Sequence, residues 1–218
     1  MFDASKLKIP TKQTPRLDAI FAILLLCATL STALCVYQAT RWNGVQAVDF
    51  GNSSKLRTES IRSSTLANTE IIVDVDTYLA WVNAVSSGDE QAARFLEDRF
   101  RPEFIPAFET WKAEGNTSNP VPPGTPFSLP EYQLAAQQES ILLEEAAAEA
   151  FEQGKDANQN GDLYIANTVL FAIVLFFCGV YMKWESPNVR TGMLIVTTAI
   201  FGFAVFLMVS LLLKVGFI

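Results

Sequence analysis

Three long, uncharged apolar stretches are the strongest constraint on what this 218-residue chain can form. They run from Ala19 to Thr40, from Leu163 to Met182 and from Thr191 to Leu213. A helix rises ~1.5 Å per residue, so ~20 apolar residues cross the ~30 Å hydrocarbon core of a bilayer. The sequence therefore predicts an integral membrane protein with three spans. The first stretch is longer than a signal-peptide core of ~7–15 residues, so we expect it to stay as an uncleaved anchor.

The segment between the first two stretches is polar and acidic. Residues 41–162 contain 20 acidic and 9 basic residues, a net charge of −11, whereas the rest of the chain carries +4. Basic residues precede the first stretch and lie in the turn between the other two, which marks both places as cytoplasmic. The predicted order is a cytoplasmic tail (1–18), a span (19–40), an extracytoplasmic domain (41–162), a span (163–182), a cytoplasmic turn (183–190), a span (191–213) and a short outer C-terminus (214–218).

The acidic segment has the periodicity of helices. Ile71, Val75, Tyr78 and neighbouring apolar residues recur at intervals of three and four, which predicts one buried helix face. We expect one cluster of aromatic side chains to be buried together: Phe95, Phe100, Phe104, Phe108 and Trp111. The predicted fold class is all-α, with three transmembrane helices and a helical-bundle extramembrane domain inserted between spans one and two.

Local signals predict where these helices begin. The first span should continue to about Asn68 and a second helix should follow from Ile71. Ser87 with Glu90, and Ser128 with Glu131, have the spacing of a capping box, which places helix starts there. Pro102 suits the first turn of another helix. The segment from Gly115 to Leu129 is rich in Pro, Gly and Ser and predicts an ordered loop anchored by Phe127.

A string of prolines and aromatic residues carries a family resemblance. It comprises the run from Arg99 to Trp111 (RFRPEFIPAFETW), the Arg41–Gln46 run RWNGVQ, Asn119-Pro120, Pro126-Phe127, Pro130-Glu131-Tyr132, Ala157-Asn158-Gln159, and Asp162-x-Tyr164 leading into the second apolar stretch. Together these resemble a family of uncharacterised bacterial membrane proteins with three spans. The resemblance implies this architecture and a bacterial source. Together with the orientation that the basic flanks predict, the expected location is a bacterial inner (cytoplasmic) membrane, with the N-terminus inside and residues 41–162 outside. The resemblance implies no activity.

One motif is that of a calcium ligand set. Asp156, Asn158, Asn160 and Asp162, with Gly161 at the turn position, match the opening of an EF-hand loop. The twelfth position is Asn167, which cannot supply a bidentate carboxylate. We therefore interpret the segment as a polar junction that leads into the second span, with weak calcium binding as the alternative. We expect no resident metal and no cofactor.

The sequence lacks the residues that catalytic sites and coupled transporters usually need. The chain has no histidine, nucleophile elbow or glycine-rich phosphate loop. The three apolar stretches contain no Asp, Glu, Lys or Arg, which disfavours a coupled transporter. They do contain small residues at helical spacing, which allow close helix contact within the protein or with another subunit. The candidate interface residues are Ala28, Thr32, Thr168, Ala172, Thr198 and Gly202.

These observations favour a non-catalytic integral membrane protein. The first hypothesis is an accessory, scaffolding or assembly subunit of a larger membrane complex. The alternatives are an extracytoplasmic sensor or ligand-binding module that acts through a partner, and a homo-oligomeric channel. The expected partners are membrane lipid and other membrane subunits or a second copy, and no nucleic acid.

Overall fold

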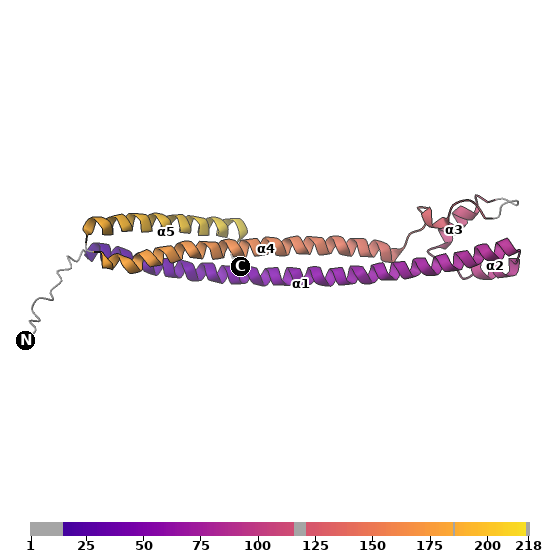
Figure 1. Cartoon of the computed structure of the whole chain (residues 1–218), viewed down its shortest axis with the longest axis horizontal. Coiled ribbons are helices and arrows are strands. Elements are labelled where there is room, and N and C mark those ends of the chain that lie inside the picture. Colours follow the sequence, from indigo (N-terminus) through magenta and orange to yellow (C-terminus); the bar gives the residue numbers. More distant parts are fainter. Residues whose placement is uncertain (1–14, 116–120, 185, 217–218) are drawn as a thin grey trace, which may run out of the picture. The chain divides into compact units, whose positions relative to one another are not determined.

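A computed structural model describes residues 15–115, 121–184 and 186–216. Within these ranges every regular element is a helix and no strand occurs. The elements in order are α1 (Pro15–Ser87), α2 (Glu90–Glu97), α3 (Ile105–Lys112), the short 3₁₀ helix η2 (Pro126–Ser128), α4 (Ala135–Val180), a second 3₁₀ helix η3 (Tyr181–Lys183) and α5 (Pro187–Val215) (Figure 1). The all-α class is confirmed.

Three of these helices are long and apolar enough to cross a membrane. They are α1, α4 and α5. α1 and α5 contain the first and third stretches of the sequence, and α4 contains the second stretch except for its last two residues, which lie in η3. The tail before Pro15 and the last two residues lie outside the described residues. The chain divides into two compact units, one of Met1–Phe50 with Glu152–Ile218 and the other of Gly51–Phe151. We call them the span unit and the polar unit.

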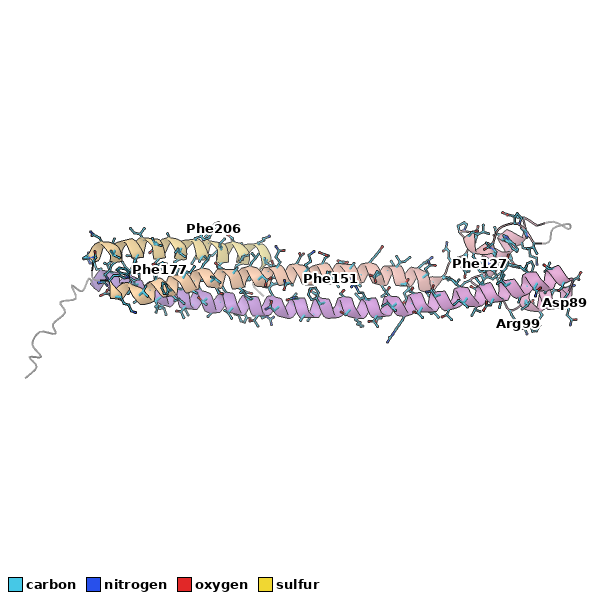
Figure 2. All side chains as sticks on the ribbon, viewed as in Figure 1. Asp89, Arg99, Phe127, Phe151, Phe177 and Phe206 are labelled. Atoms are coloured by element: carbon cyan, nitrogen blue, oxygen red, sulfur yellow. The ribbon has the colours of Figure 1, made fainter. Side chains whose placement is uncertain are left out.

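In the span unit, parts of α1 and α4 pack together with α5, which lies along α4 (Figure 1). The core consists of aromatic and small side chains: Phe21, Leu24, Ala28, Cys35, Ala39, Tyr164, Phe171, Val174, Cys178, Tyr181 and Ala204. Large apolar side chains also point outward, such as Phe206, which is 65% exposed (Figure 2). Such a pattern suits a bundle whose outer surface is covered by lipid.

Two glycines on α4 face α1 at close range. A Cβ added to Gly154 would lie 2.6 Å from the ring of Phe50, and one added to Gly161 would lie 2.7 Å from Oδ1 of Asn43. Ala157, between them on the same face, is 2% exposed. Real Cβ atoms do not approach so closely, so the residues at these positions are small because the two helices are close.

The core of the polar unit is aromatic. Phe104 is fully buried, and its ring packs on Phe100, Phe127 and Tyr132. Phe127, from the segment after α3, also meets the ring of Tyr78 on α1 (Figure 2). The cluster is completed by buried side chains of α1, α2 and α3: Trp81, Ala84, Ala93, Phe108 and Trp111. The predicted burial of Phe100, Phe104, Phe108 and Trp111 and the anchoring role of Phe127 are confirmed.

Phe95 does not belong to this core, so that part of the expectation was wrong. Its side chain is 54% exposed and lies under the guanidinium of Arg99, 3.5 Å from the ring centroid. The buried position of α2 is Ala93. Ala92 and Leu96 pack partly buried on the same side as Ala93. Phe95 follows Ala93 by two residues, about 200° around the helix, so it lies on the opposite side.

The predicted helix boundaries are wrong at four places. α1 is one continuous helix to Ser87, without a break near Asn68. α2 is capped by Asp89, whose carboxylate accepts a hydrogen bond from the Ala92 N–H, and not by Ser87. α3 begins three residues after Pro102. α4 begins at Ala135, well after Ser128, which ends η2 inside the predicted loop.

Along the rest of the polar unit, α1 and α4 meet through small and polar residues. The hydroxyl of Ser53 donates to the carbonyl of Ala147 at 2.8 Å, and that of Ser60 donates to the carbonyl of Ser140 at 2.8 Å. Ser63 donates to a carboxylate oxygen of Glu139 at 2.6 Å. These hydrogen bonds connect side chains of one helix to the other helix, and they need serine because a larger residue would separate the two backbones.

Candidate functional site

The most concentrated charge network of the polar unit centres on Asp74. Its side chain, on α1, is 1% exposed. The Oδ2 atom of Asp74 accepts hydrogen bonds from Nη1 of Arg101 at 3.0 Å and from the hydroxyl of Tyr132 at 2.9 Å. The other guanidinium nitrogen of Arg101 lies 2.8 Å from Glu70 and 3.3 Å from Glu103. One arginine therefore faces three carboxylates.

The position of each group follows from its element. Asp74 lies one turn after Glu70 on α1, so the two carboxylates share a face of that helix. Arg101 stands in the turn between α2 and α3, and Tyr132 in the segment before α4. The network thus connects α1 to two later segments. Arg101 lies 27 residues after Asp74 in the sequence, and Tyr132 lies 58 residues after it. The other carboxylate oxygen, Oδ1 of Asp74, is buried and has no hydrogen-bond partner among the described residues.

The electrostatics of the network are dominated by burial. Removal from water raises the pKa of Asp74 above its ordinary value, and the carboxylate of Glu70 acts in the same direction, while the hydrogen bond from Tyr132 and the charge of Arg101 oppose the rise. The pKa of the Tyr132 hydroxyl is also raised, first by burial and then by its hydrogen bond to Asp74. A buried carboxylate with an unpaired oxygen holds its proton more tightly than an exposed one.

This shift predicts a pH dependence of stability. The folded chain binds the Asp74 proton more tightly than the unfolded chain, so the contribution of Asp74 to stability falls as pH rises from its ordinary pKa of 3.8 to its raised folded pKa. Above the folded value the contribution is constant. The free energy of unfolding of the polar unit, measured by urea titration between pH 4 and pH 8, should show this fall. Asp74→Asn should remove it, and identical pH profiles for the two proteins would contradict the assignment.

A second polar cluster lies inside the span unit. Gln38 on α1 is fully buried, and neither atom of its amide has a hydrogen-bond partner among the described residues. The same holds for the hydroxyl of Tyr164 and for Oδ1 of Asn167, both on α4. Nδ2 of Asn167 donates to the carbonyl of Ala204 at 3.1 Å and lies 3.7 Å from Sγ of Cys35. Asn167 therefore joins all three span helices.

Gln38 and Tyr164 stand at one level of the antiparallel pair formed by α1 and α4. Asn167 contacts Cys35, and Gly161 lies against Ala39 and Asn43, so Tyr164 falls opposite Gln38. The groups of this cluster are neutral donors and acceptors, which can orient helices through hydrogen bonds but supply no charge for a cation. No group of three or more His, Cys, Asp or Glu side chains that could hold a metal occurs in the ranges that the structure covers.

A third polar group closes one end of the span unit. Asp18, near the start of α1, accepts hydrogen bonds from Arg190 in the first turn of α5 and from the hydroxyl of Tyr181 in η3. The ring of Tyr181 stacks on Phe21 at a centroid distance of 3.8 Å, and Cζ of Arg190 lies over the Tyr181 ring, 5.0 Å from its centroid. α1, η3 and α5 are thereby joined at the level where the first and third apolar stretches begin and the second ends.

The EF-hand hypothesis does not fit the fold. Asp156, Asn158, Asn160 and Asp162 lie in the middle of α4, where the backbone is helical throughout. An EF-hand loop instead wraps around its ion and turns sharply at its glycine. Gly161 serves the close approach to α1, and Asn158 donates to Asp162 along one turn of helix. The polar composition of residues 156–162 is typical of a loop. These residues are nevertheless helical, because packing against α1 stabilises the helix despite their weak helix propensity.

The six candidate interface residues fall on different sides of the spans. Ala28 is fully buried in the bundle, and Thr32 and Thr168 are half-buried, with hydroxyls that donate to carbonyls of their own helices. The others are exposed: Ala172, Thr198 and Gly202. A Cβ at Gly202 would meet no atom within 4 Å. The structure thus uses Ala28 for internal packing and leaves the exposed three open to lipid or to another subunit.

The sequence reasoning missed both buried polar clusters. It considered ionisable residues and small residues in the spans, and Gln38 and Asn167 are neither. A search for any amide side chain within an apolar stretch would have found both. Asp74 and Arg101 carried no local signal, because charged residues are common throughout residues 41–162.

Comparisons with protein-family models, curated proteins and solved structures found no significant match to this chain. The resemblance to bacterial three-span proteins therefore stays a prediction that rests on the motif residues alone.

Proposed function

We propose that this protein is a non-catalytic subunit of a larger assembly in a bacterial inner membrane, anchored by three spans with residues 41–162 on the outer side. It acts by binding another protein, either a different subunit or a second copy. The basic flanks of the apolar stretches support this orientation.

One observation carries the proposal: large aliphatic side chains are exposed in the polar unit, outside the apolar stretches. Ile61, Ile72 and Leu79 on α1 are 65%, 60% and 56% exposed. Their spacings of eleven and seven residues equal about three and two helical turns, so all three share one face of α1. Lipid does not cover this face in the proposed topology, and large aliphatic side chains repeated along one helix face in water support an interaction site.

The architecture of the polar unit explains why such a face is available. Among the described residues, the part of α1 near Ser53, Ser60 and Ala67 meets the α4 region through serine and alanine residues. Two helices cannot bury the apolar residues on both of their sides, and a third helix from another chain can cover the remaining side. The charge of the unit is negative, which favours a partner with a basic rim.

The test is to change this face and follow the association. The full-length protein, extracted from its native membranes in mild detergent, should co-migrate with a second protein or a second copy in native mass spectrometry. Replacing Ile61, Ile72 and Leu79 together with Ser should abolish this co-migration, while circular dichroism and tryptophan fluorescence stay unchanged because these side chains are exposed.

Substitutions in the spans serve as a matched pair. Gly202→Leu adds bulk to an exposed position with free space, so it should leave the protomer folded and weaken only contacts with another subunit. Ala28→Leu adds nearly as much bulk to a fully buried position and should disrupt the protomer itself. A protein that stays monomeric in mild detergent, and also by crosslinking in native membranes, would overturn the proposal in favour of an outer ligand-binding module.

A further inference from the structure

A hollow of about 580 Å³ lies on the surface of the span unit, between the end of α4 and the start of α5. We call it the α4–α5 groove. Among the described residues, its walls are apolar except for one ammonium group, and they consist of Phe176, Phe177, Val180, Lys183, Trp184, Val189 and Met193. Figure 2 labels Phe177 at this end of the unit. The volume falls within the roughly 300–1,000 Å³ typical of small-molecule sites.

The groove lies where the apolar stretches meet water. Asp18, Tyr181 and Arg190 form their ionic cluster at the same end, which marks the polar boundary of the bundle. Phe176 and Met193 line the groove from the apolar side of this boundary. Lys183 and the half-exposed Trp184 line it from the polar side. Trp at such a level suits the headgroup region of a bilayer, where its ring is half wet.

Lys183 is the charge that this groove offers to a ligand. It forms no salt bridge with any residue that the structure describes, although Glu185 lies outside those residues. The nearby Arg190 is instead paired with Asp18 and does not line the groove. An apolar groove with one cation at its water-facing end is complementary to an acyl chain attached to a negatively charged headgroup.

We propose that the α4–α5 groove binds an anionic phospholipid, with an acyl chain along Phe176, Val180 and Met193 and the phosphate at Lys183. This goes beyond subunit association and requires only that the spans are inserted in a membrane. A basic residue near an anionic lipid surface is worth ~1 kcal/mol, which corresponds to about a fivefold preference over a zwitterionic lipid.

The test is a lipid titration of the purified full-length protein followed by native mass spectrometry. Phosphatidylglycerol and phosphatidylcholine with identical acyl chains are compared. The wild-type protein should bind phosphatidylglycerol about fivefold more tightly. Lys183→Gln should reduce this preference to less than about twofold because it removes the cation. Lys214→Gln, which removes the same charge from the other end of α5, should leave the preference unchanged.

A second variant tests the acyl-chain half of the proposal. Val189→Trp fills the groove at a position that is 39% exposed, so the helices can keep their packing, and it should weaken the binding of both lipids. Equal affinities of the wild-type protein for the two lipids, or a preference that survives Lys183→Gln, would overturn the proposal.

The identity of the occupant is tested in cells. A photocrosslinking amino acid placed at Val189 should give adducts of lipid mass. Adducts of protein mass would show that a helix of another subunit fills the groove and would reject the lipid. This experiment and the titration need no partner protein, so the failure of the proposed subunit function would not affect either result.

Discussion

Replacing Phe104 with Ala is expected to lower the free energy of unfolding of the polar unit by ~3–5 kcal/mol, the usual cost of removing a fully buried aromatic ring. Phe104 is 0% exposed and contacts rings from four different segments of the unit, including Tyr78, Phe100, Phe127 and Tyr132. Its removal leaves a cavity among rigid rings that cannot collapse to fill it. Urea unfolding of the full-length protein, followed by the fluorescence of the buried Trp81 and Trp111, measures the effect.

Phe95 provides a matched control for this prediction. It is the same residue type in the same unit, nine positions away, but its ring is 54% exposed. Phe95→Ala should cost less than ~1 kcal/mol, because little apolar surface returns to water. Equal losses for the two variants would show that the aromatic cluster does not form the core of this unit.

Replacing Arg101 with Met is expected to destabilise the same unit by about 3 kcal/mol, at the lower end of the cost of breaking a buried ion pair. The variant leaves the Asp74 carboxylate, which is 1% exposed, beside Glu70 without its cation. The guanidinium retains 21% of its exposure, so water reduces the effect compared with a fully buried pair. Denaturant unfolding at neutral pH measures the loss, and acidification should restore part of it by protonating Asp74.

The double variant Asp74→Asn with Arg101→Met is the control for this pair. It removes both charges, so no buried ion is left unpaired, and it should be more stable than Arg101→Met alone. Arg101→Lys keeps the charge but loses the planar fork that reaches Asp74 and Glu70 at once, so we expect an intermediate loss. Additive losses from the two single changes would indicate that the groups do not interact.

The sequence predicted those features that depend on long stretches of similar residues. Three apolar stretches of about twenty residues predicted three helices that are long and apolar enough to cross a membrane, and the aromatic residues after Arg99 form most of the polar unit's core. Hydropathy and helical periodicity sum over many positions, so single exceptions do not change the result.

Features that depend on single contacts between distant residues were not predictable in this way. Phe95 and Phe100 are the same residue type within one short segment, and only tertiary packing, such as that of Phe100 on Phe104 and Phe108, makes one exposed and the other buried. The sequence places Gly161 at the turn position of a calcium loop, but in the structure its missing side chain leaves room for Asn43 of α1. The partner of Asp74, Arg101, is 27 residues away, and no local pattern selects it from the other basic residues.

The serine contacts between α1 and α4 have a consequence for how the polar unit opens. Hydroxyl-to-carbonyl bonds such as Ser53 to Ala147 and Ser60 to Ser140 hold this pair of helices with little apolar burial. Separating the pair therefore exposes little apolar surface and takes less free energy than opening the aromatic cluster around Phe104. In native-state hydrogen exchange, the amides near Ser53 and Ser60 should exchange through local opening, with weak dependence on denaturant. Those near Trp81 should exchange only when the whole unit unfolds.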